Sequence, residues 1–399
     1  MADGYGGGVQ STVPHRMAIR AMGVPWVLDL TELHASDRSR VRANWSRTLA
    51  DDLDPDDPTV PVFTPTYGPL GEREGVQLTA GRGAASDVDY AMSRALTVAT
   101  ITRRAGTALM LHAAGLAAPD GRTVVLVAQS GTGKSTASRV LGRHLGYVSD
   151  ETVVIEDDDT VTPYPKPLSL IREGGMPSSK GEHSPDELGL LPTPSDPRLA
   201  AVVLLDRDPD RAAPSLTRIP LVEGIVDALP QTSSVLSLRE PLHRLARALQ
   251  VGGGPWRLTY TEIEDCVDLL SELLTDGPPG SGEVTVPPWT GFAGGGEAHP
   301  HLLAGAVLGL DDAVIRQRFD EAVVSQGRIA LLIDGHPLRL DGLGTYLWQA
   351  TASPQPLRDL VAGAQREFGA HPQAERLVRD AVAELATHRV LGDGHAAAG

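Results

Sequence analysis

The segment between residues 124 and 145 limits the possible folds of this chain more than any other segment. Residues 124–127 (VVLV) form a short apolar, mostly β-branched run, which is typical of a buried parallel strand. Residues 128–136 (AQSGTGKST) follow at once, and apolar side chains then recur at helical spacing, at Ala137, Val140, Leu141 and Leu145. A strand, a glycine-rich loop and a helix in this order predict an α/β fold with a parallel sheet flanked by helices.

The loop carries the pattern of a phosphate-binding loop (P-loop), G-x-x-x-x-G-K-[ST], with Ala128 in place of the first glycine. Glycines permit the positive-φ turns that point several backbone N–H groups at phosphate oxygens, and the following helix directs its positive end at the anion. Lys134 is expected to reach the β- and γ-phosphates, and Ser135 to ligate Mg²⁺. We therefore expect ATP to contact Ser130, Gly131, Thr132, Gly133, Lys134, Ser135 and Thr136.

Two consecutive acids, Asp150 and Glu151, follow the predicted helix at the beginning of a strand candidate at 152–155. If this strand is adjacent and parallel to the first, both carboxylates emerge near the nucleotide phosphates. One could then accept the proton of an incoming hydroxyl, while the other holds Mg²⁺ directly or through water. The alternative is an exposed acidic turn, because residues 156–159 are acidic as well.

Three further residues have a weaker claim to a role. His112 stands between small and apolar residues just before the 124–127 strand, where a structural histidine is the usual finding. Asp206 ends an apolar run at 202–205 that resembles a Walker B strand, although many strands end in Asp. Lys166 stands between two prolines, and we expect a solvated lysine.

Composition excludes several classes of function. The net charge of -16 disfavours nucleic acid as a partner, since no dense Lys/Arg run offsets it. No apolar run approaches the roughly 20 residues of a membrane helix, and the N-terminus lacks a secretory signal, so we expect a cytoplasmic protein with no membrane partner. The lone cysteine, Cys266, excludes an internal disulfide and is expected to be a small apolar residue on a helix.

The chain divides into four predicted parts. Residues 1–100 form an N-terminal α/β region without assigned chemistry, and residues 101–276 form the P-loop domain. Residues 277–300, rich in glycine and proline, are predicted to be a linker. In the last part, 301–399, three short strands (322–324, 329–333 and 337–340) precede three helical segments, which predicts a winged-helix-like domain.

The stretch from His112 through Ser135 to Asp150 and Glu151 resembles the HPr kinase/phosphorylase superfamily over roughly residues 105–275. The segment YPKPLSL (164–170) is similar to a Pro-Lys-Pro segment of related proteins from natural-product clusters, including lasso-peptide kinases. The resemblance implies an HPr-kinase-like P-loop domain in which Asp150 activates a Ser/Thr hydroxyl, with His112 near the transferred phosphate. Glu151 departs from the commoner second Asp, and no HPr-binding signature is evident, so HPr itself is not the expected substrate.

Residues 318–392 resemble the PqqD-like domain, which recognises leader peptides of ribosomally made, modified peptides (RiPPs). The resemblance rests on FDEAVV (319–324), residues 329–333 and LDGLGTYLW (340–348). It implies that the leader of a precursor peptide binds the region 318–348, and we expect it to add a strand to the edge strand 322–324. A flexible linker would raise the effective concentration of the peptide at the kinase site, although a purely structural cap is the alternative.

Together these features predict an ATP- and Mg²⁺-dependent kinase, with Asp150, His112 and Lys134 as catalytic residues and Ser135 and Glu151 as metal ligands. The expected acceptor is a Ser/Thr hydroxyl of a RiPP precursor peptide. A small-molecule kinase and a non-catalytic, nucleotide-gated peptide-binding module are the alternatives. A homo-oligomer is compatible with all three.

Overall fold

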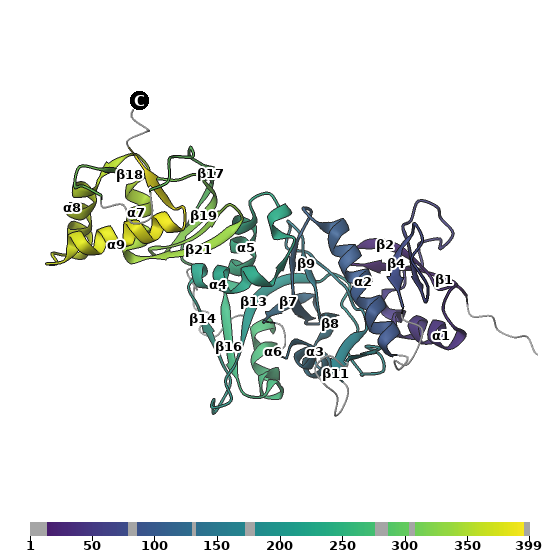
Figure 1. Cartoon of the computed structure of the whole chain (residues 1–399). Coiled ribbons are helices and arrows are strands. Elements are labelled where there is room, and N and C mark those ends of the chain that lie inside the picture. The colour runs from purple at the N-terminus through teal and green to yellow at the C-terminus, as the bar shows by residue number, and fades with distance from the viewer. Residues whose placement is uncertain are drawn as a thin grey trace, which may run out of the picture.

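The computed structural model describes residues 14–78, 86–129, 133–171, 180–275, 286–302 and 308–394, and has a mixed α/β architecture with several sheets. The molecule is elongated, with the N-terminal elements at one end, the C-terminal elements at the other and a six-stranded sheet between them (Figure 1). In the part that the structure describes, no helix is both long and apolar enough to cross a membrane.

The central sheet has the strand order β14-β16-β13-β7-β6-β8. In that order, its strands are Ser215–Arg218, Trp256–Tyr260, Arg198–Arg207, Arg122–Val127, Ala113–Ala117 and Gly146–Ser149. Strand β13 is parallel to β7 and β16, whereas β6 is antiparallel to both β7 and β8. The sheet is therefore mixed, with a parallel centre that matches the sequence-based expectation.

Both faces of this sheet are covered, which explains why the run 124–127 is apolar throughout. Val125 and Val127 pack toward α4 (Leu221–Ala228) and α5 (Pro241–Gln250), while Val124 and Leu126 pack on the opposite side. The helices on that opposite side are α3 (Lys134–Leu141) and α6 (Val267–Thr275). The alternation follows from the two-residue period of a strand.

The antiparallel strand β6 brings three chain segments to one edge of the sheet. Because β6 runs against its neighbours, its first residue lies beside the last residues of β7 and β8. The condition on which we expected both acids near the phosphates, a strand at 152–155 adjacent and parallel to 124–127, is not met, because Val153–Ile155 form β9 of another sheet. The strand that ends before the acid pair is β8, and β6 separates it from β7. The expected consequence still holds, because β7 and β8 point the same way and their carboxyl ends meet at this edge.

A second sheet, order β10-β9-β5-β15, lies beside the first. Its strands are Val161–Thr162, Val153–Ile155, Leu109–Leu111 and Thr232–Ser233. The predicted strand at 152–155 is β9 of this sheet. A separate hairpin is formed by β11 (Leu168–Ile171) and β12 (Lys180–His183).

The N-terminal region contains a four-stranded sheet, order β1-β2-β3-β4, and two helices. The elements are β1 Arg16–Ala21, β2 Val24–Asp29, α1 Ala35–Asn44, β3 Val62–Thr66, β4 Glu74–Gln77 and α2 Ser86–Arg104. Their core includes Trp26, Trp45 and Met92, and it also takes in Tyr164 from the P-loop part of the chain. Helix α2 therefore joins the N-terminal sheet to the segment that carries Lys166.

The C-terminal region has a sheet of order β17-β19-β20-β21, a small sheet of order β22-β18-β23, and three helices. Their bounds are β17 Trp289–Gly295, β18 Ala313–Arg316, β19 Phe319–Ser325, β20 Arg328–Ile333, β21 His336–Asp341, α7 Gly342–Ala350, β22 Gln355–Pro356, α8 Leu357–Phe368, α9 Ala374–Thr387 and β23 Leu391–Asp393. The predicted succession of three strands and three helices is confirmed. The β20–β21 turn has positive φ at Asp334 (49°) and Gly335 (76°), as a two-residue hairpin requires.

Two sequence-based expectations about this region are wrong. Part of the predicted linker, Trp289–Gly295, forms β17 and pairs with β19, so the predicted edge strand 322–324 is an inner strand. Residues 277–285 of that linker lie outside the described residues. The glycine content has a packing reason, because a Cβ on Gly291 would lie 2.3 Å from Nε2 of His243 on α5.

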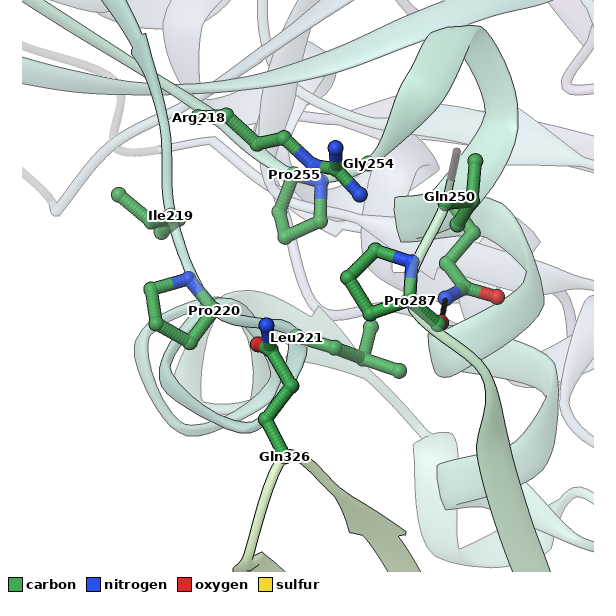
Figure 2. A pocket seen from close by; sticks show the side chains of 10 residues that line it. Arg218, Ile219, Pro220, Leu221, Gln250, Gly254, Pro255, Pro287 and Gln326 are labelled. Atoms are coloured by element: carbon green, nitrogen blue, oxygen red, sulfur yellow. Dashed lines mark hydrogen bonds between the residues drawn. The ribbon is translucent and has the colours of Figure 1, made fainter. Parts of the chain in front are cut away.

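The segment that precedes β17 is also attached to its surroundings. The Gln250 side-chain amide donates to the Pro287 carbonyl (3.1 Å), and the Ser325 hydroxyl donates to the Pro288 carbonyl (3.2 Å). Figure 2 shows Gln250, Pro287 and the Gln326 turn around a small hollow of about 220 Å³ at this junction. The described residues that line it include no carboxylate and no histidine, so they offer no general base for phosphoryl transfer.

A buried carboxylate fastens the C-terminal sheet to the P-loop part of the chain. The side chain of Glu321 on β19, in a residue that is 2% exposed, accepts the backbone N–H groups of Leu242 (2.7 Å) and His243 (2.9 Å) in the first turn of α5. Val323 and Leu332 extend the contact into the apolar core beneath α4 and α5. A carboxylate at a helix N-terminus satisfies N–H groups that the helix itself leaves unpaired.

We predict that Glu321→Ala lowers the free energy of unfolding by about 1–3 kcal/mol, because two buried N–H groups lose their acceptor. Urea unfolding monitored by circular dichroism measures this loss. Glu240→Ala, at an exposed acid beside the same helix, is the matched control and is expected to change stability little. Equal effects of the two substitutions would contradict the assigned role of Glu321.

Candidate active site

A cleft of about 660 Å³ lies at the sheet edge where β7 and β8 end and β6 begins. The predicted site residues that the structure describes all line it, namely His112, Gly133, Lys134, Ser135, Thr136, Asp150 and Glu151. Ser130, Gly131 and Thr132 lie outside the described residues. Residues separated by some 40 positions in the sequence thus share one cavity because the strand order brings their segments together.

The last glycine of the predicted P-loop has the backbone conformation that its sequence predicts. Gly133 adopts φ 100° immediately before α3, and a Cβ there would meet nothing within 4 Å, so only the backbone conformation requires glycine. The Lys134 ammonium donates to the carbonyl oxygens of Ala128 (2.6 Å) and Gln129 (3.1 Å). Burial and the nearby Lys180 cation lower the pKa of Lys134 to about 8, although Asp150 and Glu151 act in the opposite direction.

The acid pair is built around a lysine that the sequence analysis misjudged. Lys166 is fully buried, and its Nζ lies 3.1 Å from Asp150 Oδ1 and 3.2 Å from Glu151 Oε2. The expectation of a solvated lysine is therefore wrong, and so is the alternative of an exposed acidic turn at Asp150, which is buried. The sequence held one indication of this ion pair, namely an acid pair followed by a lysine between two prolines, because an extended lysine side chain can contact carboxylates of a neighbouring segment.

Charge compensation sets the protonation of this cluster. Burial alone would lower the pKa of the Lys166 ammonium, but Asp150 and Glu151 outweigh burial and hold that pKa well above its ordinary value. Burial alone would raise the pKa of the Glu151 carboxyl, but the Lys166 ammonium outweighs it and the pKa is lowered. Near neutral pH the cluster thus holds a cationic Lys166 and an ionised Glu151.

Tyr147 and Glu182 were missed by the sequence analysis. The Tyr147 hydroxyl lies 3.1 Å from Asp150 Oδ1 and 3.0 Å from the Lys166 carbonyl oxygen, and these two acceptors share its one hydrogen. Glu182 stands opposite Ser169 in the β11–β12 hairpin and accepts a hydrogen bond from its hydroxyl. Burial raises the pKa of the Glu182 carboxyl to about 7, although Lys166 and Ser169 act in the opposite direction. Neither residue stands in a recognisable motif.

The N-terminal region reaches this site through α2. Tyr90 lines the cleft, with the Lys180 ammonium 5.9 Å from its ring centroid. Two turns along the same helix, the Thr97 hydroxyl lies 3.0 Å from the Tyr164 hydroxyl and 3.5 Å from Glu151 Oε2. The N-terminal region, to which the sequence analysis assigned no chemistry, therefore supplies part of the cleft wall and a contact to Glu151.

His112 occupies the position before β6, and its backbone N–H donates to the Gln231 carbonyl (2.6 Å). Burial, together with the Lys134 cation, lowers the pKa of His112, so its ring is neutral at pH 7.

Asp206 is exposed and does not line the cleft, whereas its neighbour Arg207 does and forms an ion pair with Glu262 (3.0 Å). Successive side chains on a strand point to opposite sides, so a Walker-B-like position at the end of the run does not ensure the right orientation. Cys266 is buried among apolar residues, as expected, and burial raises the pKa of its thiol to about 12.

Among the described residues, no group of three or more His, Cys, Asp or Glu side chains is placed to hold a metal ion. The donors that line the cleft include the Ser135 hydroxyl and the Glu151 carboxylate, which are both oxygen ligands. Such a set fits Mg²⁺, which proteins usually bind through one or two carboxylates together with substrate phosphates.

Comparison with known proteins adds little. No protein-family model matches this chain, and no curated protein matches it. The chain is similar to the solved structure of the Hpr(Ser) kinase/phosphatase from Coxiella burnetii, with 14% sequence identity and a TM-score of 0.22, over 42% of this chain and 93% of that chain. A likeness at this level establishes neither the fold nor the activity of this chain.

The raised pKa of Glu182 predicts a measurable dependence of stability on pH. The folded chain keeps the Glu182 proton up to about pH 7, whereas the unfolded chain releases it near its ordinary value of 4.5. Stability contributed by this group is therefore lost as pH rises through that window. Because Glu182→Gln cannot ionise, we expect its stability relative to wild type to rise between pH 4.5 and 7, by at most about 3 kcal/mol.

Urea midpoints at several pH values measure this difference. Glu187→Gln, at an exposed acid five residues further along the chain, is the control tested in parallel and is expected to give a flat difference. A flat difference for Glu182→Gln as well would show that its pKa is not raised.

Proposed function

We propose that this protein is an ATP- and Mg²⁺-dependent kinase that phosphorylates a Ser/Thr hydroxyl of a peptide. One observation carries the proposal: the end of a P-loop, with Lys134 and Ser135, and the Asp150–Glu151 pair line the same cleft. Its volume of about 660 Å³ is in the range of small-molecule and cofactor sites.

Nucleotide binding would use the loop and the N-terminus of α3, whose free N–H groups and dipole favour phosphate. Lys134 would exchange its two loop carbonyl partners for phosphate oxygens, and its cation would stabilise the charge of the transferred group. Ser135 and Glu151 would hold Mg²⁺, which supplies further neutralisation of phosphate charge. Ser130, Gly131, Thr132, Gly133 and Thr136 would complete the phosphate contacts.

Asp150 would accept the proton of the acceptor hydroxyl. As the acceptor oxygen bonds to the γ-phosphorus, the bond from that phosphorus to the β,γ-bridging oxygen breaks, ADP leaves, and the proton remains on Asp150. Neutral His112 at the start of β6 would lie near the transferred phosphate. Tyr147 supports this assignment, because its hydroxyl fixes the orientation of the Asp150 carboxylate.

The acceptor would belong to a RiPP precursor peptide whose leader binds the region 318–348. Strand β21 supports this choice, because in the described part of the chain it has a neighbouring strand on one side only. An extended peptide can add to such an edge through main-chain hydrogen bonds. The leader would therefore add to β21 rather than to β19, whose two edges are occupied by β17 and β20.

We predict that incubation with ATP, Mg²⁺ and a precursor peptide encoded beside this protein adds the mass of one phosphate to the peptide. Asp150→Asn should slow the transfer by roughly 10²–10⁴-fold, the usual contribution of a positioned base. Lys134→Ala should abolish it. Asp157→Asn, at an exposed acid outside the cleft wall, is the control and should transfer normally.

Mass spectrometry of the peptide reads out each reaction. Full transfer by Asp150→Asn would contradict the assignment of the base. Binding of both ATP and peptide without any phosphate gain would favour the non-catalytic module.

The edge of β21 gives a separate prediction about the substrate. Ile333 and His336 flank a two-residue turn, so the hydrogen-bonding pattern alternates from there and the Arg339 N–H points away from β20. Arg339→Pro should remove one outward donor and raise the KM for the peptide by about 5–10-fold, the value of one hydrogen bond. Arg339→Ala, which keeps the N–H, is the matched control.

Steady-state kinetics with peptide and isothermal titration with an ATP analogue distinguish the outcomes. ATP affinity should be unchanged in both variants. An unchanged peptide KM in Arg339→Pro would favour a small-molecule acceptor or another docking edge.

A further inference from the structure

Three oxygen atoms of the protein lie close to the Lys166 ammonium. Two belong to the carboxylates of Asp150 (3.1 Å) and Glu151 (3.2 Å), and the third is the carbonyl oxygen of Pro167 (3.0 Å). Although Lys166 forms part of the cleft wall, no fraction of it is exposed, whereas the Glu151 side chain is 32% exposed. The ammonium therefore lies behind the two carboxylates and presents no exposed atom to a ligand.

The segment that carries Lys166 is attached to β8, the strand that ends just before the acid pair. The Tyr164 N–H donates to the Val148 carbonyl (2.9 Å), and the Lys166 N–H donates to the Tyr164 carbonyl (2.8 Å). Pro165 and Pro167 restrict φ on each side of the lysine. Burial of a long side chain usually costs much rotamer entropy. Because the backbone around Lys166 is restricted, the Lys166 ammonium has few alternative positions.

Two carboxylates on consecutive residues facing one buried site repel each other strongly in a low dielectric. A cation that contacts both removes this repulsion and fixes the direction of each carboxylate. We propose that Lys166 is a positioning residue that holds Asp150 and Glu151 side by side and directed at the cleft, acting through them and touching neither ATP nor acceptor. This inference rests on the proposed function, in which Asp150 is the base and Glu151 is a Mg²⁺ ligand.

The test compares Asp150→Asn with the double variant Asp150→Asn/Lys166→Met, which removes the buried cation together with one of its acids and so limits the risk of misfolding. The readout is the Mg²⁺ concentration that gives half-maximal binding of a fluorescent ATP analogue. We expect this concentration to rise at least fivefold in the double variant, because Glu151 loses the partner that orients it. Affinity for the analogue without Mg²⁺ should stay within about twofold.

Single-turnover phosphate transfer supplies a second readout. Lys166→Met alone is expected to lower the transfer rate at least 100-fold at temperatures well below its unfolding midpoint, while the double variant is no slower than Asp150→Asn. Arg104→Met is the matched control, since it removes a half-buried cation from an ion pair with Glu156 outside the cleft wall. It should change stability without changing either readout.

Independent effects of Lys166→Met and Asp150→Asn on the transfer rate would overturn the inference, as would an unchanged Mg²⁺ requirement. If the double variant loses as much affinity for the analogue without Mg²⁺ as with Mg²⁺, Lys166 contacts the nucleotide directly. If no variant and no wild-type protein transfers phosphate, the proposed function fails, and the Mg²⁺ requirement of analogue binding still decides the role of Lys166.

Discussion

A buried Asp150 carboxylate beside the partly exposed Glu151 carboxylate requires a cation close to both, and much of the central architecture follows from this requirement. Lys166 supplies the charge, and it can do so only because the chain returns after β9 and β10 to lie against β8. Tyr147 on β8 closes the arrangement, because Asp150 and the Lys166 carbonyl share its hydroxyl hydrogen. The acid pair, the strand before it and the Pro-Lys-Pro segment therefore form one unit, in which a substitution in one part affects the other two.

Other parts of the chain contribute to the walls of the cleft around this unit. Helix α2 brings Tyr90 to the cleft and Thr97 to Glu151, and the β11–β12 hairpin brings Ser169 and Lys180. The N-terminal sheet shares its core with Tyr164, next to the Pro-Lys-Pro segment. The N-terminal region is therefore structurally coupled to the site, although its sequence shows no chemical motif.

The C-terminal sheet is coupled to the P-loop part of the chain in a different way. A buried carboxylate, Glu321, caps α5, and apolar side chains of the same sheet enter the core below that helix. Attachment of Pro287 by Gln250 adds to this contact (Figure 2). A peptide bound to this sheet would thus be presented from a fixed surface, in contrast to the flexible tether that glycine and proline content suggested.

The sequence by itself determined the elements with strong local signals: the buried strand 124–127, the P-loop turn at Gly133, the helix after it, and the three strands and three helices of the C-terminal region. Tertiary structure decided which segments meet. Insertion of β6 between β7 and β8, burial of Lys166, pairing of β17 and the outward direction of Asp206 depend on contacts between residues far apart in the chain. Local sequence fixes backbone preference and periodicity, whereas partners for buried charges and free strand edges are chosen only when the whole chain packs.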